Sequence, residues 1–225
     1  FGDMRQAEDG SIIAGIYPTH FLSDEGKLDL SGVSFYRSTD HGHTWDVQGR
    51  LLTPDQSTDP NKHRYPNLRF YEPGFEILSD GSFLCVLRTG DVSPMYISRS
   101  EDMGRNWTNP RPFTRNGVLP RLLQLENGII VLASGRPGVQ LRFCTDGKGE
   151  EWTDPFEMLP FDYNPKDIYS PYQETCGYAD LLATGPNSFI IVFSDFKFSS
   201  PTGEKRKAIK IRHVTVNPAD RIQKL

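Results

Sequence analysis

The sequence predicts an all-β protein built from repeated antiparallel units of four short strands. Three observations predict this class. Four turns containing Gly or Asn are each followed by an apolar strand, and a motif ending in Trp follows three of them. Long stretches of helical periodicity are absent, while Gly and Pro are spread evenly along the 225 residues. A chain of this length can bury a sizeable core, and we interpret residues 1–225 as one domain.

Each predicted unit begins with a hairpin. Its turn contains Asp-Gly, Asn-Gly or Pro-Asn, and an apolar strand follows at once. Asp-Gly and Asn-Gly favour tight turns because both residues tolerate positive φ. The four segments are 8–14, 79–85, 126–132 and 185–191.

A second motif, Ser-x-Asp-x-Gly-x-x-Trp, follows three of the hairpins and is called the box below. It occurs at 38–45 and 100–107, and a degenerate copy at 144–152 has one extra residue and Cys in place of the leading Ser. The Asp carboxylate can accept backbone N–H bonds inside a hairpin turn, Gly supplies the special φ, and Trp covers the turn. We interpret the boxes as structural, with no part in chemistry.

A hairpin and a box together make four antiparallel strands. Four-stranded repeats of about 40–60 residues are typical of β-propeller blades. We expect blades at 1–55, 66–115, 117–160 and 166–216, with a connector rich in Pro, Asp and Asn between the first two. The last unit has no box, and its outer strand is predicted at 208–216, where apolar and polar residues alternate.

Composition excludes several classes of function. The net charge is −4 and the one basic block is Lys205-Arg206-Lys207, so nucleic-acid binding has little electrostatic support. No apolar run approaches the roughly 20 residues of a membrane span. Three Cys residues make no disulfide framework, and no Cys/His cluster has zinc spacing. We therefore expect no metal and no cofactor; the pattern leaves the oligomeric state open.

The repeat places certain residues at one end of each hairpin. The first strand runs toward the turn and the second runs back, so the start of the first and the end of the second share a rim. Nine positions before the turn residue lie Glu72 and Tyr178, and seven or eight positions after it lie Arg88, Arg136 and Asp195. A Glu, a Tyr and two Arg are thus predicted to converge near the mouth of a central channel, with the boxes on the opposite rim.

An ordinary structural role is the competing interpretation for each of these residues. An Arg at a strand end is usually solvated or ion-paired, and a Tyr in a strand usually packs against neighbours. The coincidence of four such residues on one rim favours a functional role for them over a structural one.

The boxes resemble those of the sialidase superfamily, also called Asp-box or BNR-repeat proteins, which are six-bladed propellers. The resemblance covers nearly the whole chain but only about four blades. It fits the last four of six, because the final blade of the family commonly lacks a box. It therefore implies that two N-terminal blades are missing here, and a first residue that is Phe rather than Met agrees with this expectation.

The resemblance extends to the rim residues. Sialidases have a Glu ahead of a Leu-x-Asp-Gly turn and an Arg that closes the hairpin, which is similar to Glu72 and Arg88 around 78–81. Sialidases have another Arg just upstream of a strand that bears a box, and Arg136 is similar to it. A nucleophilic Tyr in a Gly-Tyr-Ser-like motif resembles Tyr178, although Ala follows it here.

Two parts of the family site have no convincing counterpart. Family members bring a further Arg and a general-acid Asp from their first blades. Arg5 lies near the start of the chain, but in Met-Arg-Gln rather than the expected Arg-Ile-Pro. Arg121, two residues beyond the position equivalent to Glu72, is a weaker candidate for the site.

The resemblance implies a retaining exo-glycosidase that acts on terminal sialic acid of glycans. Arg88 and Arg136 would bind the sugar carboxylate in bidentate fashion. A carboxylate nucleophile would be repelled by this anion, whereas a neutral Tyr178 would not. Free Tyr titrates near 10, so Glu72 would act as its base. The partner is then a sialylated or other acidic glycan, and the location secreted or periplasmic.

Three alternatives stand beside this interpretation. The first is a non-catalytic carbohydrate-binding propeller, and the second is a hydrolase or lyase for another acidic sugar at the same rim. The third is an interaction scaffold, a role for which propellers are well suited.

Overall fold

The structure is a computed structural model that describes residues 2–17, 26, 32–53, 68–90, 93–161 and 175–217. Every regular element in these ranges is a β strand, and none is a helix that could cross a membrane. The all-β prediction is confirmed. The strands are β1 (Gly2–Gln6), β2 (Ile12–Ile16), β3 (Gly32–Ser38), β4 (Asp46–Leu52), β5 (Tyr71–Ile77), β6 (Phe83–Arg88), β7 (Tyr96–Ser100), β8 (Arg111–Pro112), β9 (Val118–Gln124), β10 (Ile130–Gly135), β11 (Val139–Cys144), β12 (Phe156–Leu159), β13 (Ala179–Gly185), β14 (Ser188–Ser199) and β15 (Lys205–Thr215).

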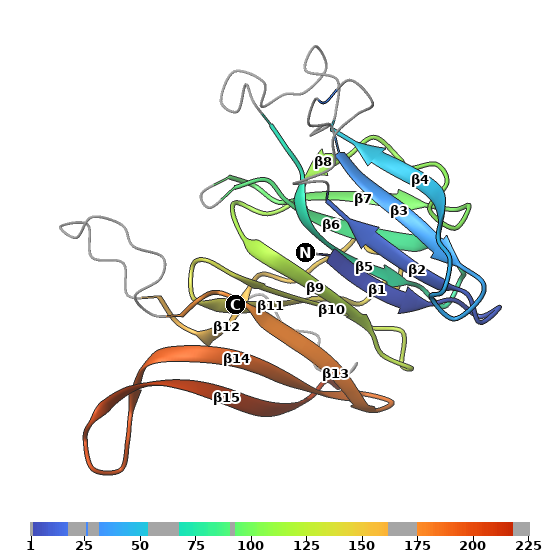
Figure 1. Ribbon diagram of the computed structural model, residues 1–225. Helices are drawn as coiled ribbons and strands as arrows, with labels where there is room; N and C mark the ends of the chain where they lie inside the picture. Colours follow the sequence, from blue (N-terminus) through green and yellow to red (C-terminus); the bar gives the residue numbers. More distant parts are fainter. Residues whose placement is uncertain are drawn as a thin grey trace. The chain divides into compact units, whose positions relative to one another are not determined.

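The strands form antiparallel meanders, the arrangement of propeller blades (Figure 1). The sheet orders are β1-β2-β3-β4, β5-β6-β7-β8, β9-β10-β11-β12 and β13-β14-β15. The last sheet differs from the expectation of four strands, because it has three within the described ranges. Its outer strand also begins earlier than the predicted 208–216, at Lys205, because β14 runs to Ser199 and pairs with it there.

The chain divides into two compact units, Phe1–Pro120 and Arg121–Leu225. Each has its own apolar core between packed sheets. In the first unit the rings of Phe35, Phe75 and Phe83 are fully buried. In the second, Phe189 and Ile191 of β14 pack with residues of β10 and β11. Alternate residues of β6 (Phe83, Cys85 and Leu87) and of β10 (Val131 and Ala133) face these cores, as the period of a β strand requires.

Two of the four predicted hairpin turns share one geometry. Asp9 Oδ1 accepts hydrogen bonds from the backbone N–H and the hydroxyl of Ser11, at 3.0 and 2.6 Å. Asp80 Oδ1 accepts the same two bonds from Ser82, at 3.0 and 2.5 Å. The Gly between them has φ of 82° in the first turn and 81° in the second, values that side-chain-bearing residues rarely adopt.

The three boxes also share one geometry. Asp40 and Asp102 each accept the backbone N–H four residues later, at 2.8 Å in both. Each Trp donates its indole N–H to the carbonyl of the box Gly, at 3.0, 3.1 and 2.9 Å along the chain. In the third box the Cys144 thiol takes the place of the Ser hydroxyl, at 2.8 Å from Asp146 Oδ1. Burial raises the pKa of this thiol to about 11, so it stays protonated.

A box also connects neighbouring sheets of the first unit. A Cβ added at Gly49 in β4 would lie 2.2 Å from the carbonyl oxygen of Gly104 in the second box. Gln48 donates its side-chain amide to the carbonyl of Met103 at 3.1 Å. The outer strand of the first sheet therefore packs directly on the next box, which fits the structural role expected for the boxes.

Candidate functional site

Glu72 lies at the start of β5, where the β5–β6 register shifts between Tyr71 and Gly74. Its φ is 39° and only 4% of its surface is exposed. One carboxylate oxygen accepts from Arg88 Nη1 at 2.7 Å, and the other accepts the backbone N–H of Leu119 at 3.0 Å. The hairpin thus brings Glu72 and Arg88 together, one from each strand, as the counting argument requires.

Leu119 occupies the position equivalent to Glu72 in the next hairpin. Its φ is 40°, nearly the value of Glu72. The left-handed backbone is therefore a feature of the repeated hairpin and not of Glu72 alone. Strain of this kind costs about 1–3 kcal/mol per residue and persists where surrounding structure enforces it. The hydrogen bond from the Leu119 N–H to the Glu72 carboxylate is one such restraint.

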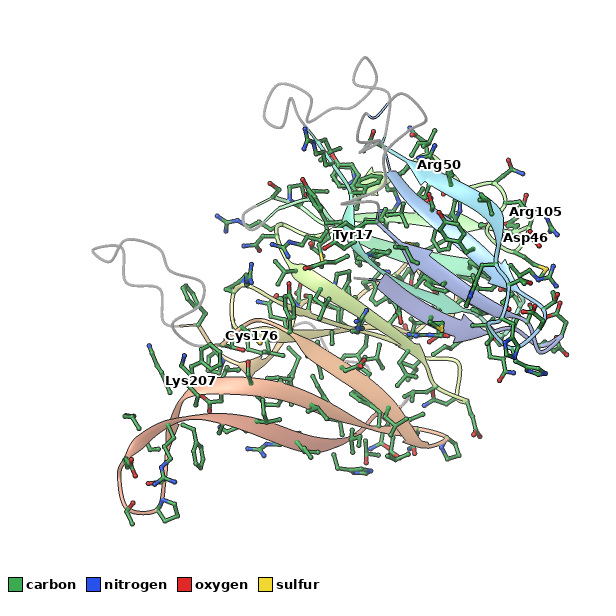
Figure 2. All side chains as sticks on the ribbon, viewed as in Figure 1. Tyr17, Asp46, Arg50, Arg105, Cys176 and Lys207 are labelled. Carbon is green, nitrogen blue, oxygen red and sulfur yellow. The ribbon has the colours of Figure 1, made fainter. Side chains whose placement is uncertain are left out.

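Tyr17 lies beside this pair and was missed by the sequence argument. Its ring meets that of Tyr71 edge to face, with centroids 5.8 Å apart. Burial raises the pKa of the Tyr17 phenol, the charge of Glu72 adds to the rise, and the charge of Arg88 opposes it. Tyr17 follows the turn Gly by seven positions, as Arg88 does, and that offset could have revealed it. Figure 2 labels its side chain at the end of β2.

In the second unit, Arg136 and Tyr178 form a pair. Arg136 follows β10, is 4% exposed and has φ of 52°. Its guanidinium carbon lies 5.8 Å from the centroid of the Tyr178 ring, within cation–π range. Arg136 also donates from Nη2 to the carbonyl of Cys176 at 3.3 Å. The buried cation therefore holds both the ring of Tyr178 and the backbone two residues before it.

Small residues fix the segment that carries Tyr178. A Cβ added at Gly135 would lie 1.9 Å from the carbonyl oxygen of Gly177, so the two backbones touch directly. The hydroxyl of Ser194 in β14 accepts the Cys176 N–H at 3.1 Å and lies 2.8 Å from the hydroxyl of Thr175. These contacts fix the backbone just before Tyr178, the residue that precedes β13.

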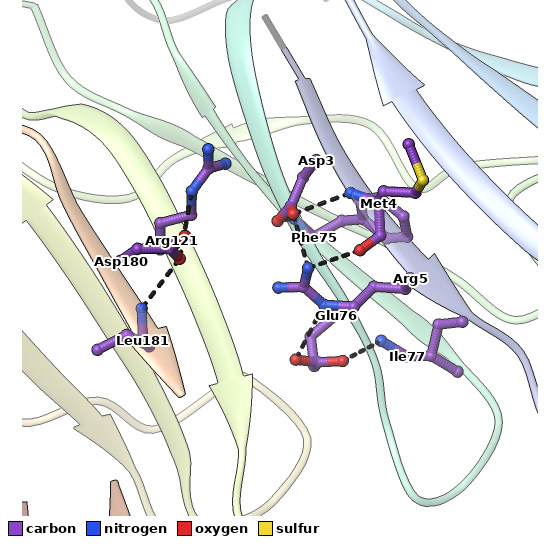
Figure 3. A network of polar contacts seen from close by, with 9 residues as sticks. All are labelled: Asp3, Met4, Arg5, Phe75, Glu76, Ile77, Arg121, Asp180 and Leu181. Carbon is purple, nitrogen blue, oxygen red and sulfur yellow. Dashed lines mark hydrogen bonds and ion pairs between the residues drawn. The ribbon is translucent and has the colours of Figure 1, made fainter. Parts of the chain in front are cut away.

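Other charged residues on the first strands of the sheets have structural partners. Arg5, which lacks the expected local motif, donates to Asp3 at 2.6 Å and to Glu76 at 3.3 Å, as Figure 3 shows. This network joins β1 to β5 within the first unit. Figure 3 also shows Arg121 of the second unit, whose Nε lies 3.7 Å from Asp180 Oδ1.

Asp195, which the counting argument also placed at the rim, is 5% exposed and paired with Lys210 Nζ at 2.5 Å. Its carboxylate is thus engaged within its own sheet.

The structure thus brings the four predicted residues together as two pairs, Glu72 with Arg88 and Arg136 with Tyr178. One pair lies in each unit. That the pairs share one opening stays a prediction. Among the described residues, no group of three or more His, Cys, Asp or Glu side chains could hold a metal ion.

Comparison with known proteins bears on the fold. No protein-family model matches the sequence, and no curated protein matches it significantly. Among solved structures, a protein of unknown function from Dyadobacter fermentans has a TM-score of 0.61 and 19% identity, over 93% of this chain and 52% of that one. The NanB sialidase of Streptococcus pneumoniae has a TM-score of 0.59 and 15% identity, over 96% and 30%. The α-L-arabinofuranosidase Arb93A of Fusarium graminearum has 0.56 and 16%, over 97% and 62%.

These likenesses show the fold. It is the β-propeller fold of sialidases and other glycoside hydrolases, although the identities are below 20%. The chain spans between 30% and 62% of the length of these three structures.

Proposed function

We propose that the protein is a sialidase-like exo-glycoside hydrolase that releases terminal sialic acid from glycans with retention of configuration. The observation that carries the proposal is the placement of Tyr178 beneath the buried guanidinium of Arg136. A nucleophile for an anionic sugar must be neutral before reaction, and a cation must lie beside it to hold the carboxylate. Tyr178 and Arg136 are residues of the two kinds that these requirements call for.

Arg136 and Arg88 bind the substrate carboxylate in this proposal. Arg136 is almost fully buried, so its charge is poorly screened and attracts an anion more strongly than a surface Arg would. The side chain of Arg88 is 16% exposed and is held by Glu72, which restricts its rotamers before substrate arrives. Preorganised cations lose less entropy on binding.

The covalent step uses Glu72 and Tyr178. Glu72 accepts the phenolic proton, the Tyr178 oxygen attacks the anomeric carbon, and the bond from that carbon to the leaving glycan oxygen breaks. The leaving oxygen takes a proton from a general acid, the Asp of the N-terminal blades in the sialidase scheme. Water then attacks the anomeric carbon and the bond to the Tyr178 oxygen breaks; the deprotonated general acid takes the proton of the water, and Glu72 returns its proton to the phenolate. Two inversions give net retention.

Turnover of a fluorogenic sialoside by the full-length natural protein tests this function. Tyr178→Phe should lower kcat/KM by about a thousandfold, since removing a nucleophile typically has effects of that order. Tyr36→Phe, a Tyr of β3 outside the site, is the matched control and should retain full activity. Full activity in Tyr178→Phe would contradict the mechanism. Turnover of a glucuronide or an arabinofuranoside in place of the sialoside would contradict the substrate class.

A second candidate is a carbohydrate-binding propeller without catalysis. It is favoured by one observation: both carboxylate oxygens of Glu72, the proposed base, already accept hydrogen bonds, one from Arg88 and one from the Leu119 N–H. It predicts sialoside binding that Arg136→Ala abolishes, with no product formed over days. A location outside the cytoplasm, where sialylated glycans are displayed, is part of both proposals.

A further inference from the structure

The last hairpin is much longer than its counterparts. β14 has 12 residues and β15 has 11, whereas β6 and β10, the equivalent second strands, have six each. The additional part comprises residues 196–207, which we call the basic arm. Phe198 pairs with Arg206 and Ser199 with Lys205, and the chain turns between them.

The basic arm extends past the end of the sheet that carries Tyr178. Ala179 pairs with Phe193, and the Cys176 N–H binds the hydroxyl of Ser194, so Tyr178 lies at the level of 193–194. Residues 196–199 therefore continue beyond that level by roughly 13 Å, at about 3.3 Å per residue. Figure 2 shows Cys176 and Lys207 toward the same end of this sheet, away from the β13–β14 turn.

The charge of the basic arm is opposite to that of the whole chain. It contains Lys197, Lys205, Arg206 and Lys207, all exposed, and one acidic residue, Glu204. Its formal charge is therefore 4 − 1 = +3, in a chain whose net charge is −4. The arm therefore places an excess of positive charge in the unit that carries Arg136 and Tyr178.

Aromatic rings of the arm contact one lysine within it, Lys207, and one just outside it, Lys210. The Lys207 ammonium lies 4.7 Å from the ring centroid of Phe196. The Lys210 ammonium lies 5.3 Å from that of Phe198 and also binds Asp195. Cation–π contacts keep a flexible Lys near one orientation while its remaining N–H groups face solvent. The arrangement suits repeated contacts with the anionic groups of an extended ligand.

We propose that the basic arm binds the part of an acidic glycan that lies beyond the sugar held by Arg136 and Tyr178. The ligand is a chain in which neighbouring sugars also carry carboxylate or sulfate groups. This inference rests on the proposed function and adds to it a preference for multiply charged glycans. A nucleic acid is the competing polyanion. We favour the glycan because β14, which continues into the arm, also binds the segment that carries Tyr178, through the hydroxyl of Ser194; single-stranded DNA is included in the test below.

The test compares two substrates and two variants of the full-length protein. One variant carries Lys197→Gln, Lys205→Gln and Lys207→Gln. The control carries Lys148→Gln and Arg212→Gln in the same unit. Lys148 adjoins Gly147, which lies near Gly128 at the opposite, turn end of the sheet, and Arg212 pairs with Ile191 well below the arm. The arm variant should lower kcat/KM for an oligomer of sialic acid about tenfold, the equivalent of about 1.4 kcal/mol, and leave a monosialoside unaffected.

Binding measurements separate failure of this inference from failure of the proposed function. Affinities of the unmodified protein and both variants are measured for polysialic acid, dextran sulfate, neutral dextran and single-stranded DNA at several salt concentrations. The inference is supported if binding of the acidic glycans weakens with salt, is lost in the arm variant and is retained in the control. This outcome would support glycan binding by the basic arm even if no sialoside is hydrolysed. Equal binding by the arm variant, or tighter binding of DNA than of either glycan, would overturn it.

Discussion

The backbone N–H of Leu119 donates to the carboxylate of Glu72 at 3.0 Å, and the two residues hold equivalent positions in neighbouring hairpins. Both adopt positive φ, 40° and 39°. The hairpin that carries Leu119 thus restrains Glu72, the candidate base, in the neighbouring hairpin. The same carboxylate binds Arg88, so it links three strands, β5, β6 and β9. Glu72 therefore has a structural role as well as its proposed chemical one, and variants must separate the two.

Glu72→Ala should lower the free energy of unfolding by about 3 kcal/mol, because Arg88 would lose its buried partner. Glu72→Gln keeps an acceptor for the Leu119 N–H and should lose only about 1 kcal/mol. Urea unfolding followed by Trp fluorescence measures both. Both variants should nevertheless lack sialoside turnover, since neither side chain can take a proton from Tyr178. Unchanged stability in Glu72→Ala would show that the contacts contribute little.

Arg5→Ala should destabilise the protein by about 2 kcal/mol near neutral pH, because Asp3 and Glu76 would lose their shared cation. Burial raises the pKa of the Glu76 carboxyl above its ordinary 4.5, and Arg5 opposes that rise. A raised pKa means that the folded state binds the proton more tightly. This carboxyl therefore favours folding below about pH 4.5, and that contribution is lost as pH rises through the folded pKa.

Without Arg5 the pKa of Glu76 should rise further. The destabilisation in Arg5→Ala should then be smaller near pH 4 than near pH 7. Unfolding curves at the two pH values measure the difference, with the exposed Arg69→Ala as control. A loss of stability that is the same at both pH values would contradict the role assigned to Glu76.

The box carboxylates should contribute to resistance against acid. The side-chain hydrogen bond from Thr44 and the backbone bonds of its turn lower the pKa of Asp40 to about 2. The backbone N–H of Asn106, followed by its side chain, lowers the pKa of Asp102 to about 2. Carboxylates with lowered pKa stabilise the folded state above their ordinary value of 3.8, and this contribution is lost as pH falls toward about 2.

The double variant Asp40→Asn, Asp102→Asn should therefore be less stable than the unmodified protein at pH 5. The gap should close as pH falls from about 4 to about 2. Denaturant unfolding across that range checks the expectation, and Asp154→Asn serves as a control outside the turns. A gap that stays constant with pH would mean that the box carboxylates act by geometry alone.

Gly135→Ala should displace Tyr178, the residue that precedes β13. The added methyl would lie 1.9 Å from the Gly177 carbonyl oxygen, so one backbone must move. Overpacking of this kind costs about 1–3 kcal/mol, and the displaced Tyr178 should lower kcat more than it raises KM. Gly185→Ala is the matched control in the same unit, because the nearest atom there is the movable hydroxyl of Ser188 at 2.9 Å. Equal kinetics in the two variants would contradict the positioning role.

The turns and boxes could be predicted from sequence because their geometry is local. A Gly with positive φ and an Asp that binds backbone two to four residues later are read directly from spacing. The pairing of Glu72 with Arg88 also followed from counting. Counting nine residues back from the turn is less accurate in the last hairpin, because its loop, 186–187, is shorter than the loop after β5, 78–82. The residue with positive φ, which is Glu72 in the earlier hairpin, is here Gly177 rather than Tyr178.

Contacts between sheets and the length of the last hairpin could not be predicted in this way. The ion network of Asp3, Arg5 and Glu76 joins two sheets that are distant in sequence, and no spacing rule specifies its partners. The basic arm was recognised only as a basic block, because its pairing depends on a bulge between Asp195 and Phe198. A bulge changes register by one residue and leaves little trace in the pattern of polar and apolar residues.

Covalent trapping of Tyr178 tests the central claim most directly. The full-length protein is incubated with a sialosyl fluoride that carries a second fluorine beside the anomeric carbon, which slows release of the intermediate, and the peptides are mapped by mass spectrometry. The account predicts that the sugar mass is found on the peptide containing Tyr178 and is absent in Tyr178→Phe. Labelling at another residue, or turnover of a sialoside without any labelling of Tyr178, would contradict it.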